Sequence, residues 1–353
     1  MPSCRGQWPT TFSRRARRTV TAGTIVLLAC GKGNDEASVA THVPRKKITI
    51  AVQPFLSQAP VLFAYADSFF AQEGLDVEFV PVASSTEAIP SLLNGDLDVM
   101  PASASPGLFN AMARGIAVRM VADRGYLDPN GCTSIAIGVP PGRAAAMQAN
   151  PRLVKRISIE RQFGILYMIE KSLESVGLTI DSLDTKFIPP LPEAEALAKG
   201  TLDAAFLSEP WIARDVSAGK AEIWLRAEKV LPNMQQGFIF FGPSLLTDDP
   251  DKGRRFLVAY RRGVAKLMEG KTPENVALLV KETGDTPELV RQSCWPTLRV
   301  DGHIDMASTQ EFQRWLQQKG LVTTPATWTQ MWDPSFLEYA DSVLRRRGSE
   351  GRL

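Results

Sequence analysis

The chain has 353 residues, of which 44% are hydrophobic and 22% are charged. These proportions are ordinary for a globular protein and too apolar for a disordered one. The length favours about two domains, because single hydrophobic cores stop growing at about 250–300 residues. No uninterrupted apolar run of about 18 residues occurs, which argues against a membrane-spanning helix.

The net charge of +2 arises from the first 29 residues. This segment contains no acid and five arginines: Arg5, Arg14, Arg15, Arg17 and Arg18. Without them, 35 basic and 38 acidic residues remain. The chain after residue 29 is close to neutral and lacks the excess of basic residues that nucleic-acid binding requires. We therefore expect no nucleic-acid partner.

The N-terminus has the pattern of an export signal. A basic segment is followed by the uncharged stretch 19–29, which is too short to span a bilayer, so residues 1–29 are predicted to be a signal peptide. The following Leu27-Leu28-Ala29-Cys30 resembles a bacterial lipobox, which implies lipidation of Cys30. The alternative is a buried apolar helix that ends in a chance cysteine, and the arginine pairs leave Sec and twin-arginine export both open.

Residues 31–44 are small, polar and patternless, so 30–46 is predicted to be a lipid-anchored tether. We therefore expect the protein in the periplasm or at the outer face of the cell membrane, with membrane contact only through the lipid.

From residue 47 onward, strand-like and helical patterns alternate. The first strand is expected at 47–52 and the first helix at 60–72, which ends at Gly74. A capping box at Ser84-x-x-Glu87 opens the next helix. Further segments follow in the order strand 97–100, helix from Pro106 to Gly115, strand 117–121. This alternation predicts an α/β fold with mainly parallel sheets whose faces are covered by helices.

The same landmarks then return about 104 residues later. Gly74 is matched by Gly177, Gly95 by Gly200, Pro106 by Pro210 and Gly115 by Gly219. The constant offset predicts two lobes built on one plan, and the period is too long for a solenoid repeat.

Two apolar strands, 134–139 and 237–241, bracket the second lobe and are interpreted as the two crossings of a hinge. The helical residues after 242 are expected to return to the first lobe and complete it. The predicted first lobe is therefore discontinuous, 47–138 plus 237–346, and the second lobe is 139–236.

This plan resembles the type II periplasmic solute-binding proteins, in the branch that serves ABC importers for nitrate, sulfonates, taurine and thiamine-type pyrimidines. The resemblance covers about residues 47–340, and it lies in the segments 74–78, 93–99, 200–205, 208–211, 320–322 and 332–336. It implies a two-lobe fold that binds a small molecule, an ABC permease as partner, and a monomer.

The candidate ligand site lies in the loops between strands and helices, because ligands of open α/β sheets bind outside the carboxyl ends of the strands. The side chains there suit an oxygen-rich anion or a polar headgroup, although serine and threonine are also common helix caps. The predicted ligand-binding residues are Gln53, Phe55, Ser85, Thr86, Ser103, Ser105, Arg124, Arg161, Gln162, Glu209 and Trp211. Tyr126, Phe163 and Phe238 could add aromatic wall area.

Two features keep alternatives open at this stage. Glu209 either faces the cleft, or is an acid placed favourably at a helix N-terminus. In an oxidising compartment Cys132 and Cys294 either form a disulfide or are two buried thiols.

Catalysis has little support in the sequence. The only histidines are His42 and His303, and no metal-binding, phosphate-loop or nucleophile-elbow motif occurs. We expect no catalytic residue, metal or cofactor. Two alternatives remain: an enzyme on the same fold, similar to pyrimidine-synthesising enzymes, and a ligand-sensing lipoprotein that transports nothing.

Overall fold

The computed structural model describes residues 44–53 and 55–350, and it contains two five-stranded sheets. The predicted signal peptide and Cys30 lie outside the described residues. The first sheet has the order β2-β1-β3-β10-β4 and consists of β1 Lys46–Val52, β2 Leu75–Pro81, β3 Val99–Ala102, β4 Arg119–Tyr126 and β10 Gln235–Phe241. The second has the order β7-β6-β8-β5-β9 and consists of β5 Ile135–Val139, β6 Arg156–Ser158, β7 Asp184–Lys186, β8 Ala204–Ser208 and β9 Glu222–Arg226.

In each sheet one strand runs against the other four. In the first sheet it is β10, which is antiparallel to β3 and β4, and in the second it is β5, which is antiparallel to β8 and β9. The remaining neighbours pair in parallel. The expected mainly parallel sheets are therefore confirmed, with one antiparallel strand in each.

The internal repeat is visible in the backbone. Each of the six paired glycines has a positive φ: 73° and 75° at Gly74 and Gly177, 83° and 66° at Gly95 and Gly200, 78° and 65° at Gly115 and Gly219. Glycine adopts this conformation without strain. Equivalent helices in the two repeats therefore end in the same way, at a glycine with a positive φ.

The helices interleaved with the first sheet are α1 Ala59–Ala66, α2 Phe69–Gln72, α3 Ser85–Asn94 and α4 Pro106–Ala113. The capping box prediction gave the correct start of α3, since Ser84 caps it by accepting a hydrogen bond from the Glu87 amide. The single helix predicted over 60–72 is instead broken, because Ser68 has φ 60°. The break turns α2 so that buried Phe70 stacks on Phe256 at 5.4 Å.

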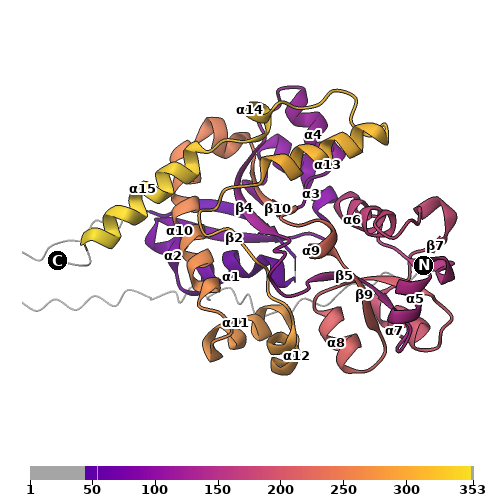
Figure 1. The fold of residues 1–353 in the computed structure, drawn as a ribbon. Helices are drawn as coiled ribbons and strands as arrows, with labels where there is room; N and C mark the ends of the chain where they lie inside the picture. The colour runs from indigo at the N-terminus through magenta and orange to yellow at the C-terminus, as the bar shows by residue number, and fades with distance from the viewer. Residues whose placement is uncertain (1–43, 54, 351–353) are drawn as a thin grey trace, which may run out of the picture. The chain divides into compact units, whose positions relative to one another are not determined.

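The helices interleaved with the second sheet are α5 Ala144–Ala149, α6 Phe163–Glu174, α7 Pro190–Ala198, α8 Trp211–Ser217 and α9 Ala227–Val230. In Figure 1 they gather around β5 and β9, away from α1, α2 and α10. The sheet has buried apolar clusters of its own, one around Ile157 and Ile169 and another around Leu202 and Ile212. We call the two sheets with these helices the first and second lobe.

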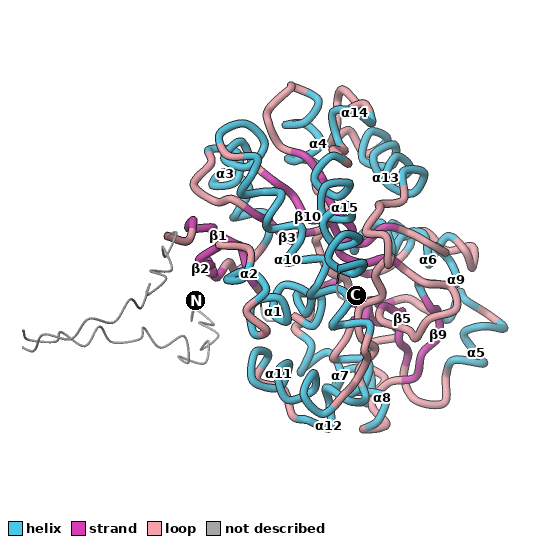
Figure 2. Tube along the Cα trace, turned by 90° about the vertical axis from the view of Figure 1, so that its left-hand side faces the viewer, coloured by secondary structure: helices cyan, strands magenta, loops and turns pink. Residues whose placement is uncertain are grey.

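The C-terminal helices are α10 Pro250–Met268, α11 Pro273–Thr283, α12 Pro287–Gln292, α13 Met306–Gln318, α14 Trp328–Met331 and α15 Ser335–Glu350. As expected, α10 returns to the first lobe and packs on α1. However, α12 contacts α8 and α13 contacts α6, so part of this segment also covers the second lobe (Figure 2). The Trp315 indole, for example, donates to Glu170 at 3.2 Å.

The two connections between the sheets are short segments, 127–134 and 227–234, rather than the strands 134–139 and 237–241 themselves. Those strands are β5 and β10, each a full member of one sheet. At the first connection Cys132 forms a disulfide with Cys294, with the Cα atoms 5.7 Å apart. The open question about these two cysteines is thereby decided, and the disulfide ties the C-terminal segment to the connection.

Candidate functional site

A cavity of about 490 Å³ is lined by both lobes. The first lobe contributes loop residues after β1 and β3, the start of α3, and residues of β4 and β10. The second contributes the loops after β6 and β8 and the start of α7. The cavity thus lies at the carboxyl ends of strands, where open α/β sheets bind ligands. Its walls also include apolar side chains: Ile135, Met168, Phe206, Leu207 and Phe312.

Eight of the eleven predicted site residues line this cavity: Gln53, Phe55, Ser85, Ser103, Arg124, Gln162, Glu209 and Trp211. Phe238 lines it as well. Thr86, Ser105 and Arg161 are not among the lining residues, and neither are Tyr126 and Phe163. Arg161 is exposed and does not line the cavity, whereas its neighbours Glu160 and Gln162 do.

The polar side chains of the first lobe are tied to one another. The Ser85 hydroxyl donates to Gln53 Oε1 at 3.4 Å, and Gln53 Nε2 donates to the Ala83 carbonyl at 3.2 Å. The Ser103 hydroxyl donates to the Gln236 carbonyl at 2.8 Å. Each hydroxyl oxygen keeps acceptor capacity toward the cavity.

Arg124 is the one cationic side chain among the residues that line the cavity. Its Nη1 donates to the Ser57 hydroxyl at 2.9 Å, whereas its Nε is buried without a hydrogen-bond partner. Burial lowers the pKa of the Arg124 guanidinium. A Cβ at Gly237 would lie 2.8 Å from Nε, so the absence of a side chain there lets the guanidinium lie against β10.

Three carboxyl groups also line the cavity, all from the second lobe: Glu160, Glu193 and Glu209. Burial raises the pKa of each of them, and that of Glu193 reaches about 7. The hydroxyl of Ser158 opposes the rise at Glu193, and the nearby Glu160 adds to it. Perturbed acids in a cleft are typical of functional sites.

Glu193 is absent from the residues predicted from sequence. It lies in the first turn of α7, after a proline, which is an ordinary place for an acid on any helix. No pattern in the chain distinguishes it from such a capping acid, and only the packing of α7 turns it toward the cavity.

Glu209 is held by two backbone groups. Its Oε1 accepts from the Cys294 amide at 2.8 Å and its Oε2 from the Ala213 amide at 3.1 Å. The first bond joins the second lobe to the C-terminal segment at its disulfide, and the second caps α8. Both roles that the sequence left open for Glu209 therefore have support, because the residue lines the cavity and also accepts a hydrogen bond at the N-terminus of α8.

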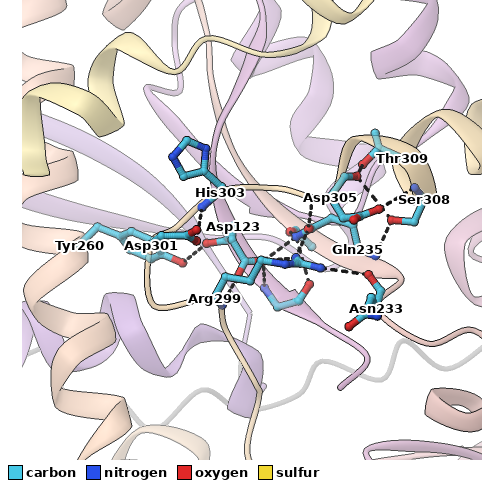
Figure 3. Close-up of polar contacts among 12 residues, drawn as sticks. Asp123, Asn233, Gln235, Tyr260, Arg299, Asp301, His303, Asp305, Ser308 and Thr309 are labelled. Carbon is cyan, nitrogen blue, oxygen red and sulfur yellow. Dashed lines mark hydrogen bonds and ion pairs between the residues drawn. The ribbon is translucent and has the colours of Figure 1, made fainter. Parts of the chain in front are cut away.

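A polar network around Asp123, the residue before Arg124 on β4, joins β4, β10 and the C-terminal segment (Figure 3). Asp123 on β4 accepts hydrogen bonds from the Gln235 side chain and from the Arg299 amide, the latter at 2.6 Å. The Tyr260 hydroxyl donates to the Asp123 carbonyl at 2.7 Å. Because Gln235 also accepts from the Asp305 amide at 2.9 Å, the segment around 299–305 is fastened to both β4 and β10.

Among residues 44–53 and 55–350, no group of three or more His, Cys, Asp or Glu is arranged to hold a metal ion. Within the same part of the chain, no helix has the length and apolar character needed to cross a membrane.

Two lobes of matching strand order around a shared cavity define the type II fold of periplasmic binding proteins. The model of the NMT1-like family matches residues 41–234, which is more than half of the 353 residues, so the chain belongs to the NMT1-like family. None of the curated proteins is similar enough in sequence to match.

Solved structures share the fold at low sequence identity. The ligand-binding component of an ABC-type import system from Staphylococcus aureus, with zinc bound, is 17% identical with a TM-score of 0.68, over 84% of this chain and 99% of that chain. The aliphatic sulphonate binding protein SsuA from Escherichia coli is 14% identical with a TM-score of 0.66, over 82% and 93%. The desulfurization enzyme DSZB is 15% identical with a TM-score of 0.61, over 86% and 100%.

Proposed function

We propose that this chain is the extracytoplasmic solute-binding component of an ABC importer, which captures a small polar or anionic organic ligand between its two lobes. The observation that carries the proposal is the cavity lined by both lobes, with the Arg124 guanidinium inside it and no carboxylate paired to that guanidinium among the described residues. A ligand that contacts both lobes stabilises the closed form by the difference in its contacts between the open and closed states.

The family and the fold support the same function. SsuA binds aliphatic sulphonates by its name, and the Staphylococcus aureus protein serves an import system. Hydroxyls at Ser85 and Ser103 and the amide of Gln53 add neutral hydrogen-bonding groups on the side of Arg124. This set suits a carboxylate, sulfonate or similar oxyanion at one end of the ligand.

A thermal-shift screen over sulfonates, carboxylates, pyrimidines and nitrate tests this proposal. A ligand present at about 100 times its dissociation constant stabilises the protein by about 2.7 kcal/mol, which a melting curve resolves. Calorimetry on Arg124→Gln then assigns the site, since the variant is expected to bind the hit at least about tenfold more weakly. A protein that no solute stabilises would not be a binding component.

Transport requires a permease partner, and this distinguishes the importer from a sensing lipoprotein. Deleting the gene is expected to abolish cellular uptake of the isotopically labelled hit, and re-expression to restore it. Unchanged uptake, combined with tight binding in solution, would favour the sensing role.

The location of the protein also belongs to this proposal. We place it at the outer face of the cell membrane, attached through lipidated Cys30, which lies outside the described residues. Intact mass of the purified protein, compared with a Cys30→Ser variant, tests the anchor: the lipid mass is expected on the former alone, and the variant is expected in the soluble fraction.

One observation favours an enzyme as the second candidate. The Glu193 carboxyl, with a pKa of about 7 inside the cavity, has the properties of a general acid or base, and DSZB is an enzyme on this fold. Incubating the hit with the protein and analysing it by mass spectrometry decides between the two, because a binding component returns its ligand unchanged.

A further inference from the structure

The charges that line the cavity do not balance for a simple anion. Arg124 provides one positive charge, on the first lobe, whereas three carboxyl groups face the same space from the second. A nitrate or an alkyl sulfonate would satisfy the guanidinium and leave the carboxyl groups without a partner.

The three carboxyl groups are not equivalent. Glu209 already accepts hydrogen bonds from two backbone amides, one on each oxygen. Glu160 and Glu193 have no Lys, Arg or His within ion-pair distance among the described residues. Glu193 is only 6% exposed, and Glu160 lies close enough to raise its pKa further. Glu193 is buried and Glu160 is half-buried, and two neighbouring acids in such a place without a cation are costly unless they hold a proton or a positively charged group.

Arg124 presents the complementary situation on the first lobe. Its neighbour Ser57 is neutral, and its Nε atom is buried without an acceptor. A buried guanidinium is stabilised most by a carboxylate or sulfonate that it can contact through two N–H groups. The apolar side chains that line the cavity, Ile135, Phe206 and Leu207 among them, offer room for an apolar linker between two charged ends.

We infer that the ligand is dipolar: it carries an acidic group that binds Arg124 and a protonated amine or amidine that binds Glu160 and Glu193. This inference rests on the proposed function, because it assigns the charges of the ligand that the same cavity captures. Each lobe then contacts one charged end, so only a ligand with both charges stabilises the closed form fully.

Two sets of matched probes test the charges separately. The rigid set is 4-(aminomethyl)benzoate, 4-methylbenzoate and 4-methylbenzylamine, which share a ring and differ in charge. The flexible set is 6-aminohexanoate, hexanoate and hexylamine. Calorimetry is expected to show that the dipolar member of at least one set binds at least about tenfold more tightly than either of its analogues, since each end adds a charged hydrogen bond.

Glu160→Gln and Glu193→Gln are both expected to remove this advantage, leaving the dipolar probe and its anionic analogue within about threefold of each other. Glu195→Gln is the matched control, because Glu195 lies on the same helix and is exposed and paired with Lys220 at 2.7 Å. It is expected to keep the preference of the unmodified protein. Two variants protect the test in case one of them folds poorly.

Several outcomes would overturn the inference. If the anionic analogue binds as tightly as the dipolar probe, the ligand is a plain anion and the proposed function stands without the inference. If Zn²⁺ or Ca²⁺ alone binds, and Glu160→Gln and Glu193→Gln both abolish that binding, the acid pair is a metal site. If no member of either set binds at millimolar concentration, the assignment of charges is wrong, and the broader solute screen alone decides the proposed function.

Discussion

The two lobes place equivalent strands in the same order, yet they line the cavity with opposite charge. The first lobe contributes Arg124 and neutral polar groups, and the second contributes Glu160, Glu193 and Glu209. Strand order and glycine turns define the backbone fold that the two lobes share. The side chains at the strand ends vary independently of this fold. An internal repeat therefore predicts where a ligand binds better than it predicts what the ligand is.

Two equivalent carboxylates, one in each lobe, extend the comparison beyond the cavity. Asp98 and Asp203 hold equivalent positions and accept hydrogen bonds from equivalent strands, at 2.9 Å from the Thr49 amide and 2.9 Å from the Arg156 amide. Their cations differ. Asp98 pairs with Lys252, whose side chain is 14% exposed, and Asp203 pairs with Arg156, whose side chain is 44% exposed.

The largest expected effect comes from removing these two carboxylates separately. Asp98→Asn is expected to lower the free energy of unfolding by about 3–5 kcal/mol, because it leaves the largely covered Lys252 ammonium without a counter-charge. Asp203→Asn is expected to cost clearly less, because Arg156 is solvated. Urea unfolding of both variants measures the difference, and equal losses would show that burial of the cation is not the cause.

The next effect concerns the acids of the second lobe and depends on pH. The pKa of Glu193 is about 7 in the folded protein and close to 4.5 in the unfolded chain, so the folded protein holds a proton that the unfolded chain has released between these values. The contribution of Glu193 to the free energy of unfolding is therefore expected to be largest below pH 4.5. It is expected to fall by about 2–4 kcal/mol as the pH rises to 7.

Comparing Glu193→Gln with the unmodified protein isolates this contribution, since the other raised acids stay in both. Melting temperatures from pH 4.5 to 7.5 are expected to fall more steeply with pH in the unmodified protein. Parallel curves would mean that the pKa of Glu193 is the same in the folded and the unfolded protein. The equivalent helix of the first lobe, α3, has Ala88 and Ile89 at this level, so it adds no such slope.

A third prediction compares the residues before the two matching prolines, Ser105 and Glu209. The Ser105 hydroxyl is buried without a partner, whereas both oxygens of Glu209 accept backbone hydrogen bonds. Sequence alone predicts that Glu209→Gln weakens binding and leaves the melting temperature of the unliganded protein nearly unchanged. The hydrogen bonds change this expectation: because a glutamine has one carbonyl oxygen, an amide loses its acceptor, and we expect a loss of about 1–3 kcal/mol.

Ser105→Ala is the matched control and is expected to change the unfolding free energy by less than Glu209→Gln. The two variants are compared by denaturant unfolding without ligand. If Glu209→Gln leaves the stability unchanged and only weakens binding, the residue acts on the ligand, as the sequence alone predicts.

Much of the two-lobe fold was predictable from patterns in the sequence. Glycines with a positive φ, such as Gly95 and Gly200, mark helix ends through a conformation that other residues avoid, and a capping serine such as Ser84 marks a helix start. Strand alternation and the constant offset then give two sheets. The glycine, capping and alternation signals are local and the offset is a property of the sequence alone, so none of them depends on how the lobes pack.

The site depends on packing, and there the sequence was less informative. Arg161 and Glu160 are neighbours in one loop, and no local rule says which of them faces the cavity. Glu193 resembles any acid in a first helical turn. The contact of α13 with the second lobe and the bond from Cys294 to Glu209 arise from a segment about 85 residues away or more in sequence, which no local period encodes.

The last comparison concerns a glycine on the antiparallel strand of each sheet. A Cβ at Gly237 on β10 would lie 2.8 Å from Arg124 Nε, and a Cβ at Gly138 on β5 would lie 2.4 Å from Leu207 Cδ1. Gly237→Ala is therefore expected to push the guanidinium out of place and weaken an anionic ligand about tenfold, with little loss of stability, because the group that moves is the end of a long side chain.

Gly138→Ala is expected to act mainly on stability. Leu207 is buried in the core of the second lobe and also lines the cavity, so its displacement is expected to lower the free energy of unfolding by about 1–3 kcal/mol and to weaken the ligand clearly less than tenfold. Calorimetry and urea unfolding on both variants give a two-by-two comparison. If Gly237→Ala weakens the ligand no more than Gly138→Ala does, the position of Arg124 is set by something other than the missing side chain at Gly237.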